Sequence, residues 1–537
     1  MSRLPWVWAS PPHGELSALS RDLEAGLLPA DRELIKENRL RSVWRVPGVD
    51  GGLLLKHYRI REGEALKTRL LGGRAEREYR AMESFCRAGL PSARPIAFAN
   101  NWQSGRLVEA WFLSRFVPAA RPLADVLLSH AHDEQACFAL AEQAVAVVAQ
   151  MHKHPFLHRD LHSGNLLIDG DGQLVIIDLH SLWHVRKLSA RQRWDTLARL
   201  VFSMRETVSL DDAPRLAALY ASEWGELPSL AVRSLSSALD RFASDYRRGR
   251  SARCLRTSSE FVREQLNGQR VHRRRDYDPK QLIEDLQHHR QLVSDGGTLL
   301  GDAGAAQVSS SGVSKASRVI KHYRRRGPLL ALRCWAGHSR ARVAWVSARR
   351  CAVHGVPTPR ALALVEESDG SSWLVTDELG NAPSLREIAA DMQGSTTVDQ
   401  RGPLAFALGH VVGRLSRAGL RHADLSSKNI LIDPGPPPRT RDRRTCPGTD
   451  SVNVQLIDLD GMRVGKAHDG ADLLRMLSQL ADLPSWVTHT DRSRFAMGFR
   501  ASSGKIIPED LARQALHAGR QRGLRRQALE SAARPSA

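Results

Sequence analysis

The chain has 537 residues, of which 42% are hydrophobic and 25% charged, and its formal net charge is +20. This length exceeds what one hydrophobic core usually organises, so we expect two globular domains of roughly 250 residues each. The composition excludes a disordered or fibrous chain. The excess of positive charge favours anionic partners, such as a phosphorylated glycolipid, an acidic membrane face or nucleic acid, although a generally Arg-rich proteome would produce the same excess.

The six cysteines are scattered and contain no C-x-x-C pair, which argues against a zinc site or a disulfide framework. The N-terminal segment has no continuous apolar stretch, so we expect no signal peptide. No uncharged apolar run approaches the length of about 18 residues that a membrane-spanning helix needs. We therefore expect a cytoplasmic protein whose contact with a membrane is at most peripheral.

The first half begins with an apolar strand, LLLKHYRIR, and a helix, AEREYRAMESFCRAGLP, follows it. The stretch WFLSRFVPAARPLADVL then reads as a strand, a turn and the start of a helix. A long apolar helix, ALAEQAVAVVAQMHKH, leads to the motif HRDLHSGNLLID, and the strand LVIID comes after it.

Five residues of this half form the pattern of a phosphoryl-transfer site. Asp160 lies five residues before Asn165, and the next strand ends in Asp178. This order is typical of protein-kinase-like enzymes. We expect Asp160 to orient or deprotonate the attacking hydroxyl, and Asn165 and Asp178 to hold Mg²⁺ against the phosphates of ATP. Lys56 would contact the α- and β-phosphates, and Glu78 would pair with Lys56 and hold it in place.

The boundary between the domains is expected near residue 290. Residues 190–290 read as helices because their apolar positions recur with a helical period. The segment 294–315 is rich in Gly and Ser, and it could link the domains or form the phosphate-side hairpin of the second half. We therefore assign residues 1–290 to the first kinase-like domain and residues 291–537 to the second.

The second half repeats the first. RVIKHYRRR places Lys321 where the first half has Lys56, and HADLSSKNILID answers HRDLHSGNLLID. The separations agree, since 104 residues separate Lys56 from Asp160 and 103 separate Lys321 from Asp424. A repeat of this kind predicts two copies of one design.

The second copy is less complete. Asp424 is the candidate catalytic residue, Asn429 and Asp458 are the candidate metal ligands, and the ammonium group of Lys428 could approach the transferred phosphate. The position of the helix glutamate, however, falls on Ala344. We therefore expect the second half to be a weak enzyme, a differently assembled one or a degenerate pseudokinase.

Two further segments of the second half are distinctive. The Pro- and Arg-rich stretch 434–451 separates its two motif aspartates by 34 residues, against 18 in the first half, and predicts a surface loop. The C-terminal segment is helical and basic, with Arg522, Arg525 and Arg526 close together. This cluster is more typical of a solvated helix face than of a contact with an anionic surface.

Neither half has the motifs of an ordinary protein kinase. No G-x-G-x-x-G precedes Lys56 or Lys321, so backbone N–H groups of Gly51–Gly52 and of Ser309–Gly312 would have to cover the phosphates. D-F-G is replaced by D-L-H in the first half and by D-L-D in the second, and no A-P-E segment follows. A phosphorylation-controlled activation loop is therefore not expected.

The motifs K-H-Y-R, A-x-x-E-Y/W, G-[LIV]-P, HRDLHSGN and LIDLD together resemble those of the lipopolysaccharide core kinase family, which includes the Kdo and heptose kinases of Gram-negative bacteria. The resemblance implies an α+β fold of two tandem protein-kinase-like domains, each with a small β-rich lobe and a larger helical lobe. It also implies ATP and Mg²⁺ as cofactors. The acceptor would be an anionic glycolipid or sugar of the lipopolysaccharide inner core, phosphorylated at the cytoplasmic face of the inner membrane.

Three other functions remain open. A protein Ser/Thr or Tyr kinase would use the same catalytic residues, and a small-molecule phosphotransferase of the aminoglycoside or choline type would tolerate the missing glycine motif. A catalytically dead scaffold is a further alternative, above all for the second half. Nucleic-acid binding is not expected, because no aromatic ladder or helix-turn-helix pattern accompanies the arginine clusters.

Overall fold

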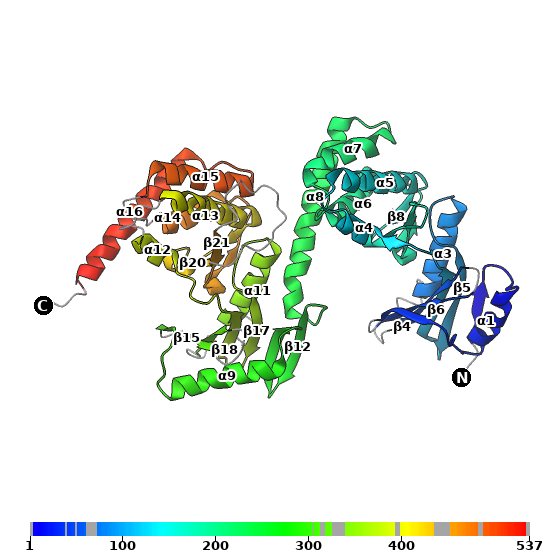
Figure 1. Cartoon of the computed structure of the whole chain (residues 1–537), viewed down its shortest axis with the longest axis horizontal. Helices are drawn as coiled ribbons and strands as arrows, with labels where there is room; N and C mark the ends of the chain where they lie inside the picture. The colour runs from blue at the N-terminus through cyan, green and yellow to red at the C-terminus, as the bar shows by residue number, and fades with distance from the viewer. Residues whose placement is uncertain are drawn as a thin grey trace. The chain divides into compact units, whose positions relative to one another are not determined.

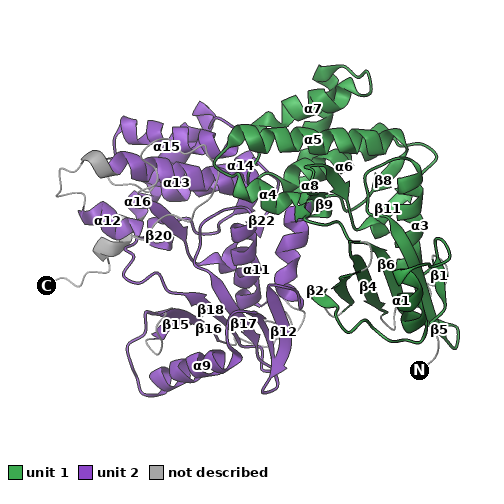
Figure 2. Ribbon diagram, turned by 45° about the vertical axis from the view of Figure 1, so that its right-hand side comes forward, with its two compact units in different colours: residues 1–245 green, residues 246–537 purple. Residues whose placement is uncertain are grey.

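The computed structural model describes residues 4–37, 40–48, 51–60, 72–303, 306–311, 317–324, 339–391, 398–433, 452–481 and 487–532. The chain divides into two compact units, residues 1–245 and residues 246–537 (Figures 1 and 2). Each unit combines an antiparallel sheet with a larger, mainly helical part. The predicted α+β fold of two tandem domains, each with a small β-rich lobe and a larger helical lobe, is therefore confirmed.

The small lobe of the first unit is a six-stranded antiparallel sheet with the strand order β1-β5-β6-β4-β3-β2. Its strands are β1 (Trp6–Trp8), β2 (Glu33–Glu37), β3 (Arg41–Val46), β4 (Leu53–Arg59), β5 (Pro95–Gln103) and β6 (Arg106–Arg115). Helices α1 (Glu15–Glu24) and α3 (Arg74–Arg87) pack against the sheet. Because successive side chains of a strand point to opposite faces, Leu55 packs with α1 while Tyr58 packs with α3.

The large lobe of the first unit is built around helix α5 (Glu134–Lys153), whose start is capped by the side chain of Asp133. The other helices are α4 (Leu123–Ser129), α6 (Ala190–Ser203), α7 (Ala213–Ser222) and α8 (Pro228–Ser251), which crosses the division between the units. The short strands are β7 (Arg121–Pro122), β8 (Phe156–His158), β9 (Leu166–Ile168), β10 (Leu174–Ile176) and β11 (Leu182–His184). The 3₁₀ turns are η2 (Ser163–Asn165), η3 (Leu179–Ser181) and η4 (Leu210–Asp212).

The small lobe of the second unit is a seven-stranded antiparallel sheet with the order β12-β13-β17-β18-β16-β15-β14. Its strands are β12 (Phe261–Leu266), β13 (Gln269–Arg274), β14 (Gly301–Ala303), β15 (Ala306–Ser311), β16 (Arg318–Tyr323), β17 (Ala361–Glu366) and β18 (Ser372–Asp377). Figure 1 shows α9 (Pro279–Ser294) and α11 (Arg340–Val353) beside this sheet, and separate hydrophobic clusters join each helix to it.

The hairpin β12–β13 corrects the prediction that residues 190–290 are helical throughout. Its turn is Asn267-Gly268, with φ angles of 49° and 78°. An Asn-Gly pair at positive φ is a strong hairpin signal. Because β13 pairs with β17, the hairpin belongs to the second sheet. The units accordingly divide at residue 245, earlier than the expected boundary near residue 290.

The large lobe of the second unit contains α12 (Leu385–Asp391), α13 (Val398–Ala418), α14 (Gly470–Leu480), α15 (His489–Ser503) and α16 (Glu509–Ala532). Its short elements are β19 (Leu420–Arg421), β20 (Ile430–Asp433), β21 (Asn453–Leu456), β22 (Arg463–Val464), η6 (Ser427–Asn429) and η8 (Leu459–Gly461), whereas η5 (Ala252–Leu255) packs against the small-lobe sheet. The predicted surface loop 434–451 lies outside the described residues. Within the described ranges, no helix combines the length and the apolar character needed to cross a bilayer.

Candidate active site

The first site begins with a buried ion pair between β4 and α3. Lys56 Nζ lies 2.6 Å from Glu78 Oε1, and the two side chains are 8% and 0% exposed. The hydroxyl of Tyr58, two residues after Lys56 on the same face of β4, donates to the second carboxylate oxygen of Glu78. The structure thus joins the predicted strand lysine and helix glutamate, and Tyr58 adds a contact that the sequence did not reveal.

Asp178, two residues after the end of β10, completes this cluster. Its Oδ1 lies 3.7 Å from Lys56 Nζ, 3.0 Å from Arg41 Nη1 and 3.0 Å from His180 Nδ1. Burial alone would raise the pKa of the Asp178 carboxyl, but the hydrogen bond with His180 and the charges of Lys56 and Arg41 hold this pKa well below its usual range. Asp178 is therefore ionised at neutral pH.

The backbone at Asp178 is left-handed, with φ 62°, and Asp458 in the second unit has nearly the same value, φ 61°. Each residue immediately precedes a 3₁₀ turn, η3 or η8. A non-glycine residue in this region is strained by about 1–3 kcal/mol and persists only where its surroundings impose it. The shared conformation indicates that both units impose the same geometry on this aspartate.

Asp160 lies in the loop between β8 and η2, and its side chain is 58% exposed. The amide of Asn165 donates to the carbonyl of Asp160 at 2.9 Å. The N–H of Ile177 donates to the carbonyl of Asn165 at 2.9 Å, which joins this loop to the residue before Asp178. Arg199 from α6 approaches Asp160, with Nη1 3.7 Å from Oδ1. Asp160 is thus held by its backbone while its carboxylate remains accessible.

His158 supports the backbone of this loop. Its side chain is fully buried, and its Nδ1 accepts the backbone N–H of Asp160 at 3.2 Å. Burial lowers the pKa of His158 to about 4, so the ring is neutral at pH 7. A buried neutral imidazole that accepts a loop N–H positions the loop and does not transfer protons at that pH.

The donor set of the first site fits Mg²⁺. The Asn165 side chain uses its N–H group for Asp160, which leaves its amide oxygen as a ligand, and Asp178 supplies an ionised carboxylate. Mg²⁺ commonly binds one or two such groups together with substrate phosphates. Among the described residues, no three His, Cys, Asp or Glu side chains gather into a metal cage. A cation at this position would therefore depend on phosphate oxygens as well.

In the second site, Lys321 is held differently. Ala344 is the fifth residue of α11, as Glu78 is the fifth residue of α3, and it is buried at the face of the second sheet. With no carboxylate there, Lys321 Nζ pairs with Asp458 Oδ1 and lies 3.7 Å from Asp460 Oδ2. The helix glutamate is absent, as the sequence predicted, and Asp460 brings a second carboxylate to Lys321 from another element.

Asp460 stands two residues after Asp458, where the first unit has His180 after Asp178. Its side chain is 7% exposed, and Arg340 Nη2 lies 2.6 Å from its Oδ2. Burial alone would raise the pKa of Asp458, but the charge and hydrogen bond of Lys321 lower it below its ordinary value. The only signal for Asp460 in the sequence was the second acid of the D-L-D motif.

The catalytic loop of the second unit has the same construction as that of the first. The amide of Asn429 donates to the carbonyl of Asp424 at 2.9 Å and to its Oδ2 at 3.0 Å. His422 Nδ1 accepts the N–H of Asp424 at 3.2 Å. Lys428 Nζ lies 3.3 Å from Asp424 Oδ2, in an exposed pair. The structure therefore brings together Asp424, Asn429 and Lys428.

The residues expected to cover the phosphates are only partly described. Gly51 and Gly52 have φ angles of 87° and 102° in the turn before β4, a conformation that glycine adopts without strain. Ser309 is buried within β15, and Gly312 lies outside the described residues. Arg41 and Arg199, which contact the two key aspartates of the first site, were not found from the sequence.

Comparison with known proteins adds three findings. Residues 59–220 and 296–498 match the model of the Lipopolysaccharide kinase (Kdo/WaaP) family. A 3-deoxy-D-manno-octulosonic acid kinase of Stenotrophomonas maltophilia is 28% identical over 203 residues, which are 34% of this chain and 76% of that protein. One of Xanthomonas axonopodis pv. citri is 35% identical over 103 residues, which are 19% of this chain and 39% of that protein.

Among solved structures, WaaP in complex with acyl carrier protein aligns with a TM-score of 0.33 and 20% sequence identity, and the alignment covers 47% of this chain and 93% of that chain.

Proposed function

Because the chain belongs to the Lipopolysaccharide kinase (Kdo/WaaP) family, we propose that it transfers phosphate from ATP to a sugar hydroxyl of the lipopolysaccharide inner core, using the site of its first unit. The observation that carries this proposal is the Lys56–Glu78–Asp178 cluster, in which a buried lysine is positioned by two carboxylates. Kdo is the favoured acceptor sugar, because the matching relatives are named as Kdo kinases; heptose is the alternative.

Each residue of the first site has a distinct role in the transfer. The acceptor hydroxyl attacks the γ-phosphorus of ATP, and the bond to the oxygen that leaves with ADP breaks. Asp160 accepts the hydroxyl proton or orients the hydroxyl, and its exposure keeps it accessible to an acceptor. Lys56 binds the α- and β-phosphates, and Glu78 keeps Lys56 in place. Most of the rate enhancement arises from positioning and charge neutralisation.

Asn165 and Asp178 would hold Mg²⁺, through the amide oxygen and the carboxylate. The metal supplies neutralisation of the negative charge on the ATP phosphates. Arg41 and Lys56 face the Asp178 carboxylate with positive charge and hold it in place. The lowered pKa of Asp178 keeps its carboxylate ionised over the whole neutral range, as a metal ligand must be.

The second unit holds a differently assembled version of the site. Asp424 is its candidate catalytic residue, Asn429 and Asp458 its metal ligands, and Lys321 and Lys428 its phosphate contacts. Lys321 is anchored by Asp458 and Asp460 in place of a helix glutamate, which supports nucleotide binding by this unit. A catalytically dead scaffold is the competing function for this unit, because the position of the glutamate is Ala344.

The reaction takes place at the cytoplasmic face of the inner membrane, where the acceptor is an anionic glycolipid. The net charge of +20 supports peripheral attraction to such a surface. The attraction is electrostatic and falls off within about 8–10 Å at physiological salt.

The substrate class is tested by offering labelled ATP and Mg²⁺ with several acceptors in parallel: deacylated lipopolysaccharide inner core, a generic protein, an aminoglycoside and choline. We expect label on the inner core only, and loss of that label in Asp178→Asn. Label on the protein alone would instead identify a protein kinase, and label on the aminoglycoside or choline a small-molecule phosphotransferase. Nucleotide binding without transfer to any acceptor would favour the scaffold.

A further inference from the structure

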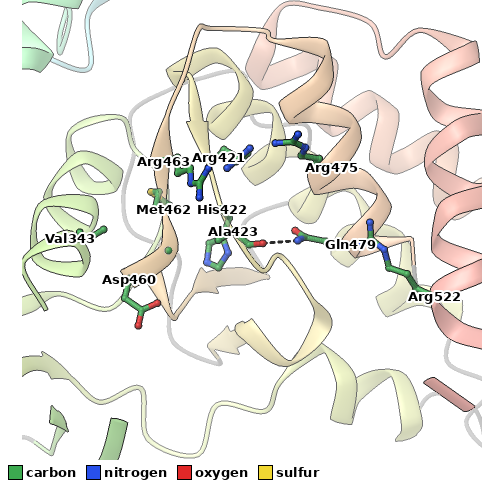
Figure 3. Close-up of a pocket in the computed structure, with 11 residues that line it drawn as sticks. Val343, Arg421, His422, Ala423, Asp460, Met462, Arg463, Arg475, Gln479 and Arg522 are labelled. Atoms are coloured by element: carbon green, nitrogen blue, oxygen red, sulfur yellow. Dashed lines mark hydrogen bonds between the residues drawn. The ribbon is translucent and has the colours of Figure 1, made fainter. Parts of the chain in front are cut away.

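An open pocket of about 690 Å³ lies in the second unit, at the side of the loop that carries Asp424 (Figure 3). Its walls come from α11, from β19 and the two residues after it, from η8, and from β22, α14 and α16. Four lining side chains are arginines and one is acidic; these are Arg421, Arg463, Arg475, Arg522 and Asp460. The pocket falls in the size range of small-ligand sites.

The positive charge of this pocket is largely uncompensated. Asp460 is already paired with Lys321 and Arg340, and Arg421 pairs with Asp472 at 3.0 Å. The other three arginines of the pocket have no carboxylate partner among the residues that the structure describes. Like charges gathered around one cavity repel each other, so an anionic ligand would be stabilised there.

The two arginines at the base of the pocket form a cross-strand pair. Arg421 of β19 lies directly opposite Arg463 of β22. The equivalent pair in the first unit, between β8 and β11, is Leu157 opposite Trp183. Like charges directly opposite each other destabilise a strand pair, and the first unit shows that this fold does not need them here. Their presence in the second unit therefore points to a ligand.

The pocket wall is connected to the candidate catalytic residue. Gln479 of α14 donates to the carbonyl of Ala423 at 2.6 Å and accepts the N–H of Leu425 at 2.9 Å. These two residues flank Asp424. Figure 3 shows the first of these bonds beside the arginines. A ligand in the pocket would therefore lie next to the loop that presents Asp424.

We propose that this pocket binds the phosphate or carboxylate groups of an acidic sugar ligand and so positions it beside Asp424. The inference rests on the proposed function and names where the second unit binds the charged groups of such a ligand. Guanidinium groups form paired hydrogen bonds with phosphate and carboxylate, which explains the use of arginine here. The same chemistry is offered by two sources, the lipopolysaccharide inner core and a free phosphorylated compound.

The test is calorimetric binding to the full chain without ATP. The probes are deacylated inner-core oligosaccharide, the same oligosaccharide after dephosphorylation, and inorganic pyrophosphate. The pocket variant is Arg463→Ser/Arg475→Ser/Arg522→Ser. The matched control, Arg500→Ser/Arg513→Ser/Arg520→Ser, removes three exposed arginines from α15 and α16 that do not line the pocket. Thermal unfolding of both variants establishes that they fold.

We expect the pocket variant to bind the oligosaccharide at least about tenfold more weakly, and the control to bind it within about twofold of the wild type. If the wild type binds pyrophosphate but no oligosaccharide, and the pocket variant binds pyrophosphate about tenfold more weakly, a free phosphorylated compound is identified as the source of the ligand. Equally weakened oligosaccharide binding in both variants, or unchanged binding in both, would overturn the proposal that the pocket binds this ligand. So would a wild-type chain that binds no probe.

Binding without ATP separates this inference from the proposed function. A pocket variant with unchanged binding, in a chain that phosphorylates the inner core, would overturn the pocket and leave the function standing. A pocket variant with weakened binding, in a chain that transfers phosphate to no acceptor, would support the pocket and contradict the proposed function.

Discussion

Replacing Glu78 with Gln removes a buried negative charge while it keeps the shape of the side chain. Glu78 is fully buried, and its Oε1 lies 2.6 Å from Lys56 Nζ. The amide oxygen of Gln can still accept the hydroxyl of Tyr58, so the change isolates the effect of the charge on Lys56. Lys56 is itself only 8% exposed, and water cannot readily replace the lost partner.

The expected loss of unfolding free energy follows from the surroundings of Lys56. Removing one partner of a buried ion pair costs about 3–5 kcal/mol. Lys56 keeps a second carboxylate, Asp178, with Oδ1 at 3.7 Å, so we expect the lower end, about 3 kcal/mol. Lys56→Met removes the opposite charge. In the variant carrying both changes no buried charge of the pair is left alone, so a coupling of about 2 kcal/mol is expected.

The assay is urea unfolding followed by tryptophan fluorescence, with each transition fitted separately because the chain has two units. At a slope of about 3 kcal/mol per M, the midpoint of the affected transition shifts by about 1 M. Glu83→Gln is the matched control on the same helix, since Glu83 is partly exposed and pairs with Arg87 one turn later in α3; its effect should stay under about 0.5 kcal/mol. A Glu78→Gln effect as small as this control, or a coupling near zero, would refute the reasoning.

Three further predictions concern the second site, acid stability and the hairpin turn. In a chain whose first site is disabled by Asp178→Asn, Asp460→Asn should weaken nucleotide binding about tenfold, since Lys321 and Arg340 lose a buried carboxylate. Unchanged nucleotide binding would contradict the role of Asp460 in holding Lys321. Burial lowers the pKa of His158 to about 4 and that of His152 to about 3. The free energy of unfolding of the first unit should therefore fall by about 1.4 kcal/mol per pH unit for each histidine as the pH drops from about 6.5 to 4. His152→Gln should remove the contribution of one histidine to this slope. The sign follows from the unfolded chain binding protons that the folded histidines reject; a flat profile would contradict it. Gly268→Ala, at φ 78°, should destabilise the second unit by about 1 kcal/mol, whereas Gly249→Ala within α8 should stabilise by about 0.5–1 kcal/mol, both measured by urea unfolding; equal effects of the two would contradict the turn assignment.

The order of motifs in the sequence predicted the tandem fold and most of the first cluster. The strand lysine and the helix glutamate could be matched because a strand and the following helix must pack together, and the structure brings Lys56 and Glu78 into contact. Arg41 was not predictable in this way. It reaches Asp178 from β3, 137 residues away in the chain, and such a contact depends on the packing of the two lobes.

The second unit shows where sequence reasoning was incomplete. Ala344 identified what is missing, but the carboxylate of Asp460 approaches Lys321 from a different element, which only the three-dimensional structure shows. Arg522 was assigned to a solvated helix face, and it lines the arginine pocket because α16 packs beside α14. Residues 261–274 form a hairpin within the region 190–290 that is predicted to be helical, because the helical period of the segments before it does not continue through the Asn-Gly turn.

Phosphate transfer from ATP to deacylated inner core by Asp160→Asn, Asp424→Asn and the variant with both changes tests most directly whether the first unit performs the chemistry. Asp171→Asn, an exposed aspartate in the β9–β10 turn, is the matched control. We predict that Asp160→Asn lowers the rate by at least about 10²-fold, and that Asp171→Asn leaves it unchanged. A wild-type rate in Asp160→Asn, with the loss confined to Asp424→Asn, would contradict the assignment of the reaction to the first unit.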